Sequence, residues 1–191
     1  MGALLILDEI PHALGRTGKM FSVEHYGIVP DMLVIGKGLG GGIFPLAAMI
    51  TKEEHDVAGT KALGHYTHEK NPVACAAALA TIEVIEEENL LEHTQALGAY
   101  TLNRLREIGQ KYPFVGDVRG IGLMLGVEIV GENANDMAES IMYRALSMGL
   151  SFKLTMGNIL LLVPALTITE EQMDQGLSIL QSCFDEIASG D

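Results

Sequence analysis

Two short runs near the start of the chain, residues 3–7 and 32–35, contain only apolar side chains. Unbroken apolar runs of this length are typical of strands covered on both faces, as in a parallel sheet. The intervening segment predicts a crossover connection with a turn at residues 15–18 and a short helix at residues 22–26. A third strand is expected at residues 46–50. The first part of the chain therefore predicts an α/β arrangement.

The rest of the chain changes from long helical patterns to shorter elements. The alanine-rich segment 73–88 predicts a helix, with Pro72 in its first turn, and a second helical pattern continues to Lys111. Thr169 and Gln172 have the spacing of a capping box for a final helix. Between these helices we expect a strand at 123–130, a helix at 136–148 and two short strands at 152–154 and 159–163.

Composition narrows the classes of protein. Hydrophobic residues make up 48% of the 191 residues, which is enough for a substantial core. The formal charge of −13 repels phosphate backbones and anionic membranes, so we expect no nucleic-acid partner and no membrane association. Cys75 and Cys183 are the only cysteines, and no cationic leader precedes an apolar segment, which predicts a reduced, cytoplasmic protein.

Two features carry candidate chemistry: the acids Asp8 and Glu9 after the first apolar run, and Lys37 between two glycines after the second. An acid that follows an apolar run can meet a cation with little competing water, and an amine among glycines can approach a flat ligand closely. A phosphate-binding loop would need Ser or Thr after Gly-Lys, whereas Met20 and Gly38 occupy those positions. The pattern therefore favours a cofactor site over nucleotide hydrolysis.

Several ordered motifs support a specific resemblance. Leu-Asp-Glu-Ile at 7–10, Gly-Arg-Thr-Gly-Lys-Met-Phe at 15–21 and Gly-Lys-Gly-Leu-Gly-Gly-Gly at 36–42 resemble the signature of class III aminotransferases, pyridoxal-phosphate enzymes of fold type I. The resemblance implies that residues 1–92 are the C-terminal part of a cofactor-binding large domain, a mainly parallel sheet with helices. Residues 93–191 would then be a linking helix and a small C-terminal α+β domain.

The resemblance also implies roles for three residues. Asp8 would pair with the pyridine nitrogen of pyridoxal 5′-phosphate, and Lys37 would carry the cofactor as a Schiff base and shuttle a proton during transfer of an amino group. Thr67 would contact the cofactor phosphate of the neighbouring subunit, which implies a homodimer with a shared site. The substrates would be an amine or amino acid and a keto acid. On their own, Asp8 could cap a helix, Lys37 could be a solvated surface lysine and Thr67 could cap a loop.

The chain departs from this family at two positions that bear on the substrate. Pro11 and His12 stand where many relatives have a glutamine facing the cofactor's phenolic oxygen, so we expect His12 to make that contact. Leu161 stands where relatives that handle α-amino acids have a carboxylate-binding arginine. Three alternatives therefore stay open: a lyase acting on amino-alcohol phosphates or phosphonates, an epimerase, and a transaminase of amines.

The length of the chain and the remaining polar residues lead to further expectations. Members of the family are typically about twice this length. This predicts that the chain is a C-terminal fragment with an exposed sheet edge. The alternative that the truncated chain has no catalytic activity stays open. His65 and His68 flank Thr67, but no matching ligand spacing accompanies them, so we expect loop hydrogen bonds and no metal site. Glu9 is expected either to orient Asp8 and the loop beyond it or to form a structural salt bridge.

Overall fold

The computed structural model describes residues 2–61, Gly64 and residues 67–189. The chain divides into two compact units, Met1–Leu91 and Glu92–Asp191. The sequence analysis placed a domain boundary between residues 92 and 93, and the roles it gave to the two domains stay a prediction.

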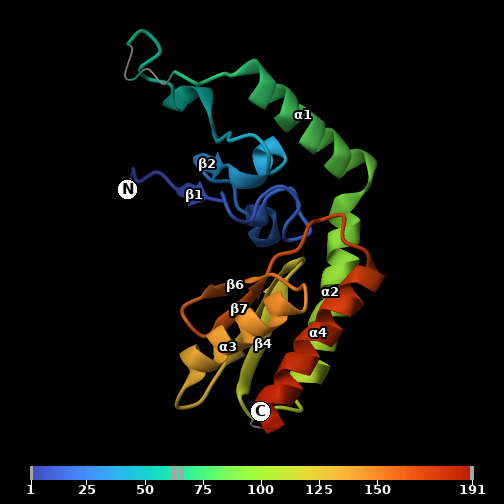
Figure 1. Ribbon diagram of the computed structural model, residues 1–191. Coiled ribbons are helices and arrows are strands. Elements are labelled where there is room, and N and C mark those ends of the chain that lie inside the picture. The colour runs from blue at the N-terminus through green and yellow to red at the C-terminus, as the bar shows by residue number, and fades with distance from the viewer. Residues whose placement is uncertain (1, 62–63, 65–66, 190–191) are drawn as a thin grey trace. The chain divides into compact units, whose positions relative to one another are not determined.

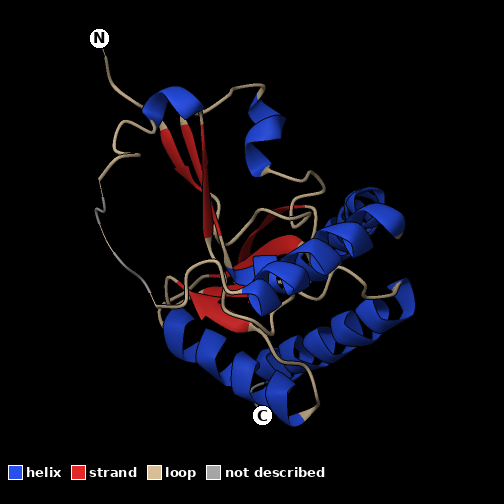
Figure 2. Cartoon of the chain, turned by 90° about the horizontal axis from the view of Figure 1, so that it is seen from above, coloured by secondary structure: helices blue, strands red, loops and turns tan. Residues whose placement is uncertain are grey.

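Figures 1 and 2 show the helices and strands. Those that begin in the first unit are β1 (Ile6–Asp8), η1 (Ser22–Tyr26), β2 (Met32–Ile35), η2 (Lys37–Gly40), β3 (Ala48–Thr51), η3 (Glu53–His55), α1 (Pro72–Glu87) and α2 (Leu90–Gly109).

The three strands of the first unit form one sheet in the order β1-β2-β3. β1 and β2 are parallel, with Asp8 paired to Val34, and β3 runs antiparallel to β2. The predicted parallel pair is confirmed. Because β1 and β2 point the same way, their carboxyl ends lie at the same edge of the sheet.

The outer parts of this sheet are exposed in the chain. Leu4, Ile6 and Met49 are 52%, 56% and 58% exposed. Residues 3–7 are therefore not covered on both faces in this chain, as the predicted exposed sheet edge implies, whereas β2, between the other two strands, has buried residues at Leu33 and Ile35. An apolar run shows that a strand can be buried. In this chain the central strand β2 is the one with buried residues.

Helix α1 begins as the sequence predicts. Pro72 is its first residue, and Asn71 caps it by accepting a hydrogen bond of 2.9 Å from the Val73 amide. The helix packs against η2. A Cβ atom added at Gly41, where φ is 67°, would lie 3.1 Å from the Thr81 hydroxyl oxygen, so this turn allows the helix to approach closely.

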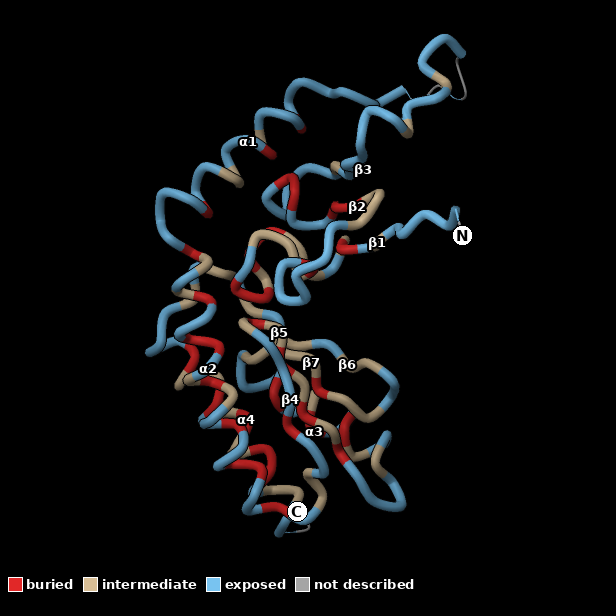
Figure 3. Tube along the Cα trace, turned by 180° about the vertical axis from the view of Figure 1, so that it is seen from behind, coloured by how far each residue is buried: buried red, intermediate tan, exposed pale blue. Residues whose placement is uncertain are grey.

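The second unit contains a four-stranded antiparallel sheet in the order β4-β5-β7-β6. Along β5, Leu125, Val127 and Ile129 are at most 1% exposed and alternate with less buried residues, so one face of the sheet carries the core. Buried positions also run along α2 and α4 (Figure 3). The elements after α2 are β4 (Val115–Ile121), β5 (Met124–Ile129), α3 (Ala134–Ser147), β6 (Lys153–Thr155), β7 (Ile159–Leu162) and α4 (Glu170–Ser189).

An aromatic cluster and a capping box fix the last helix. The rings of Tyr112 and Phe184 meet edge to face with centroids 5.3 Å apart, and the Tyr112 hydroxyl donates a 2.6 Å hydrogen bond to Asp185. Burial, and then this hydrogen bond, raise the pKa of Tyr112 to about 12.

The predicted capping box is confirmed, because the amides of Thr169 and Gln172 each bond the side chain of the other residue, at 3.0 and 3.2 Å.

The sequence analysis missed strand β4. Its residues Val-Gly-Asp-Val-Arg-Gly-Ile contain two glycines and two charges, and only Val118 is buried. β4 is an edge strand with an irregular register between Val115 and Asp117, and Arg119 on it bonds both Asp117 and Glu128 at 2.7 and 2.6 Å. A half-exposed edge strand needs few apolar residues, so its apolar pattern is weak.

None of the helices in the described part of the chain combines the length and apolar character that a membrane crossing needs.

A close approach of two glycines leads to a stability prediction. A Cβ atom at Gly98, inside α2, would overlap the carbonyl of Gly122 in the β4–β5 turn, where φ is 55°. We expect Gly98→Ala to lower the free energy of unfolding by about 1 to 3 kcal/mol in urea titrations, although alanine favours helices.

Gly176→Ala in α4 is the matched control, because its Cβ would meet only Leu150 Cδ1 at 3.5 Å, an ordinary contact. This variant should be as stable as the unchanged chain or up to about 1 kcal/mol more stable. Equal stability of the Gly98 and Gly176 variants would contradict the close approach.

Candidate cofactor site

Asp8 is the last residue of β1 and its side chain is exposed. Its Oδ1 accepts a 3.1 Å hydrogen bond from the Ile10 amide two residues further on. This is a local turn contact and not the cap of a helix. The carboxylate therefore stands at the carboxyl end of a parallel strand and retains acceptor capacity.

Lys37 follows β2 with one glycine between them and begins η2. Its side chain is exposed, and its backbone has φ of 47°, in the left-handed region. A residue other than glycine in this conformation costs about 1 to 2 kcal/mol. Such costs concentrate at functional sites, because the surrounding structure must hold the residue there.

The segment after Asp8 packs against both neighbours of Lys37. A Cβ atom at Gly36 would lie 3.6 Å from the side chain of Ile10, and one at Gly38 would lie 3.7 Å from Leu14 Cδ1. Leu14 is itself left-handed, with φ of 58°. The loop after Asp8 therefore runs close to both neighbours of Lys37, and these spacings would also accommodate a Cβ atom.

Glu9 is 2% exposed and anchors the loop beyond Asp8. Its two carboxylate oxygens accept hydrogen bonds of 2.7 Å from the amides of Ser22 and Val23, at the start of η1. Glu9 Oε2 also lies 3.9 Å from His12 Nδ1. Of the two predicted roles, the structure shows the one in which Glu9 orients the loop.

His12 lies in the same loop, between Ile10 and Leu14, and its side chain is 30% exposed. Its Nδ1 is 2.8 Å from the Ser22 hydroxyl oxygen. Ser22 was not singled out in the sequence, because a serine in a turn resembles many others; its contacts with Glu9 and His12 appear only in three dimensions. The predicted contact of His12 with a cofactor stays a prediction.

Thr67 is exposed and lies in a turn at residues 67–70, with no hydrogen bond to Asp8, Lys37 or His12. Its predicted contact with the cofactor phosphate of a neighbouring subunit stays a prediction. His65 lies outside the described residues, and His68 is exposed. Across the described ranges, no group of three or more His, Cys, Asp or Glu residues is arranged to hold a metal ion.

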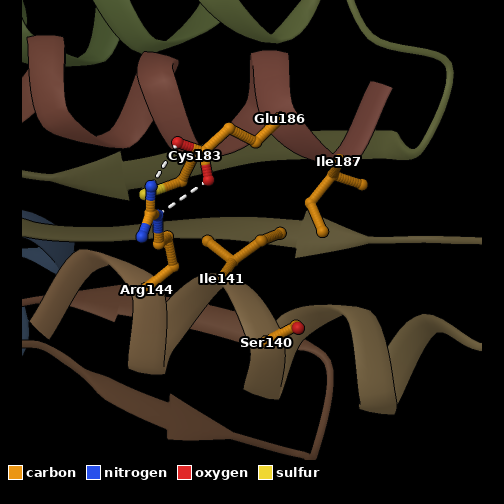
Figure 4. Close-up of a pocket in the computed structure, with 6 residues that line it drawn as sticks. All are labelled: Ser140, Ile141, Arg144, Cys183, Glu186 and Ile187. Atoms are coloured by element: carbon orange, nitrogen blue, oxygen red, sulfur yellow. Dashed lines mark hydrogen bonds and ion pairs between the residues drawn. The ribbon is translucent and has the colours of Figure 1, made fainter. Parts of the chain in front are cut away.

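A separate cavity of about 510 Å³ lies in the second unit between α3 and α4 (Figure 4). Arg144 bridges both oxygens of Glu186 at 2.7 Å, beside the buried Cys183. Burial raises the pKa of the Cys183 thiol, so it remains protonated and is a poor nucleophile. This cavity therefore lacks the reactive groups found at the edge of the first sheet.

Leu161 lies in β7, paired with Gly126 on β5 and with Lys153 on β6. Its side chain is half-buried. Leucine offers no hydrogen-bond donor to a carboxylate, so this position cannot bind an acid in the manner of arginine.

Comparisons with known proteins agree with this geometry. Residues 1–184 match the family described as Aminotransferase class-III. The chain is 47% identical over 189 residues to the (R)-1-hydroxy-2-aminoethylphosphonate ammonia-lyase of Vibrio splendidus, covering 96% of the chain and 40% of that protein. It is 42% identical over 195 residues to the leucine/methionine racemase of Thermococcus litoralis, covering 99% and 44%. The ornithine aminotransferase structure from Toxoplasma gondii superposes with a TM-score of 0.92 at 29% identity, over 98% of the chain and 44% of that structure.

The chain belongs to the class III aminotransferase family, which has the type I fold of pyridoxal-phosphate enzymes. It spans less than half the length of the relatives described above.

The residues at the sheet edge fit pyridoxal 5′-phosphate, the cofactor of this family. Lys37 offers an exposed amine between glycines, and Asp8 offers a carboxylate at the end of the adjacent parallel strand. An amine suits the cofactor's aldehyde, and a carboxylate suits its protonated pyridine nitrogen. Within the described chain, Thr67 is the one predicted contact for the phosphate.

The left-handed backbone at Lys37 gives a stability prediction. Glycine adopts this conformation without a Cβ penalty, whereas alanine does not. We expect the free energy of unfolding, measured by urea titration, to be about 1 kcal/mol larger for Lys37→Gly than for Lys37→Ala. Both variants lack the amine, so the difference isolates the backbone. If the alanine variant is equally or more stable, the residue is not held left-handed.

Proposed function

We propose that the chain carries the attachment site of a pyridoxal-phosphate-dependent aminotransferase, which moves an amino group between an amine or amino acid and a keto acid. The observation that carries this proposal is the pairing of β1 with β2. It sets Asp8 and Lys37 at the same edge of one sheet, where the loop after Asp8 runs close to both neighbours of the lysine.

Each residue has a definite part in this proposal. Pyridoxal phosphate supplies an electron sink for the bond that breaks at the substrate's α-carbon. Asp8 keeps the pyridine nitrogen protonated through a charge-assisted hydrogen bond. Lys37 holds the cofactor and, when the substrate amine displaces it, carries a proton at Nζ between the substrate and cofactor carbons.

The remaining parts of the proposal concern assembly and location. Thr67 serves the cofactor phosphate of a second copy, so the working form is a homodimer with a shared site. Cys75 and Cys183 are both free thiols, which supports a reducing, cytoplasmic environment.

The direct test is an absorbance spectrum of the purified chain with pyridoxal 5′-phosphate, before and after borohydride. The unchanged chain should show the long-wavelength band of a lysine adduct, and reduction should trap it. Lys37→Ala should lose more than nine-tenths of the trapped adduct. Lys70→Ala is the matched control, because Lys70 is also an exposed lysine with left-handed φ, of 55°, and should keep the band.

Equal trapping in the Lys37 and Lys70 variants would show that the adduct is a surface reaction and would overturn the assignment of Lys37. If the unchanged chain forms no adduct, these 191 residues do not form a working attachment site on their own, and the non-catalytic alternative holds.

A second candidate, a lyase or epimerase on the same fold, is favoured by one residue and two relatives. Leu161 removes the usual means of holding an α-carboxylate. The two relatives named above are an ammonia-lyase acting on a phosphonate and an amino-acid racemase.

Single-turnover spectra separate the two candidates. An aminotransferase should convert the bound cofactor fully into its amine form when it is given an amino donor and no keto acid. The donors should include a simple α-amino acid, an amine and an aminophosphonate, because Leu161 bears on this choice. Release of ammonia, or inversion of the donor, while the amine form never accumulates would reject the aminotransferase in favour of the second candidate.

A further inference from the structure

The second unit contains a smaller cavity, of about 120 Å³, beside the first half of α4. It is lined by the segment that follows α3, by the end of β7 and by one face of α4. Leu177 and Leu180 on α4 are 3% and 0% exposed. Ser151 and Gln172 are exposed, so they mark the side that is open to solvent. The cavity therefore reaches from the surface towards the core of this unit.

The walls of this cavity are apolar. Ser151 and Gln172 are the only polar side chains among the described residues that line it, and none of those residues carries a charge. A buried water makes about two to four hydrogen bonds, and side chains such as Leu177 and Leu180 offer none. An ion would lose its hydration without gaining a partner. The inner part of the cavity therefore favours an uncharged, apolar occupant.

Gly176 keeps this space open along α4. Its backbone is not in the left-handed region, so the conformation does not require glycine. Packing does not require it either, because an added Cβ atom would meet only Leu150 Cδ1, at an ordinary 3.5 Å. Glycine inside a helix is less favourable than alanine. The sequence thus gives up helix stability at a position where the evident effect is to leave the cavity unfilled.

The volume of the cavity limits the size of its occupant. An apolar protein cavity of about 150 Å³ stays dry and binds benzene or xenon. With about 120 Å³, this cavity has room for one small ring or one short branched chain. Transfer of such a group from water to apolar walls is favourable, roughly in proportion to the apolar area that is buried.

We propose that this cavity is a binding site for a small, uncharged aromatic or branched aliphatic molecule, whose apolar part lies against Leu177 and Leu180. The described residues that line it all belong to the second unit, whereas Asp8 and Lys37 belong to the first. Binding here needs neither Lys37 nor the cofactor, so this inference is independent of the proposed function.

The test is NMR of the full chain labelled with ¹³C at the methionine methyl groups, with benzene as the probe. Met173 lines the cavity and is 6% exposed, whereas Met156, between β6 and β7, is 85% exposed and does not line it. Met173→Leu and Met156→Leu assign the two signals. The Met173 signal should shift saturably as benzene is added, and the Met156 signal should not. No saturable shift of Met173, or an equal shift of Met156, overturns the proposal.

A variant at Gly176 tests whether benzene occupies this cavity. Gly176→Leu should fill the space and weaken benzene binding by about tenfold or more. Ser140→Leu is the matched control, because Ser140 lines the larger cavity between α3 and α4 and not this one. The control should bind benzene as the unchanged chain does. Unchanged affinity in a folded Gly176→Leu chain, or an equal loss in both variants, rejects the site.

Gly176→Ala keeps the test decisive if the leucine variant does not fold. The alanine variant is expected to be at least as stable as the unchanged chain, and its added methyl group takes up part of the cavity. Its affinity for benzene should fall by about threefold or more, because the ring then has less room against α4. An affinity equal to that of the unchanged chain would place benzene elsewhere and overturn the proposal.

Discussion

The candidate site depends on the parallel pairing of β1 with β2. This pairing aligns Asp8 with Val34, so the acid and the segment that carries Lys37 leave the sheet at one edge. The loop after Asp8 runs close to Gly36 and Gly38, the two neighbours of Lys37. The acid and the lysine thus both lie at the ends of two neighbouring strands.

A charged residue is buried at this edge of the sheet. Glu9 is almost fully buried, and it uses both carboxylate oxygens to hold the amides that start η1. These two hydrogen bonds fix the loop that contains His12 and Ser22. The side chains of Asp8 and Lys37, by contrast, remain exposed. The family relatives include a lyase and a racemase, and the same framework therefore supports more than one reaction.

The sequence was sufficient for features that depend on local patterns. The start of α1 at Pro72 and the capping box at Thr169 were predicted, because each depends on neighbours a few residues apart. The parallel pairing of β1 with β2 was predicted from two unbroken apolar runs joined by a crossover. Strand β4 was missed because an exposed edge strand needs few apolar residues. The contact of Glu9 with Ser22 joins residues 13 apart, and the left-handed φ of Lys37 depends on the loops around it, so neither leaves a clear local signal.

The exposure of β1 has a consequence for the behaviour of the chain in solution. In the described residues β1 hydrogen-bonds to β2 on one side only, while Leu4, Leu5 and Ile6 are each more than two-fifths exposed. An unpaired strand edge with apolar side chains can extend its ladder with the same edge of another molecule. Self-association would therefore compete with folding more strongly as concentration rises, so the yield of soluble chain would be governed by the edge of β1, a few residues before the acid of the candidate site.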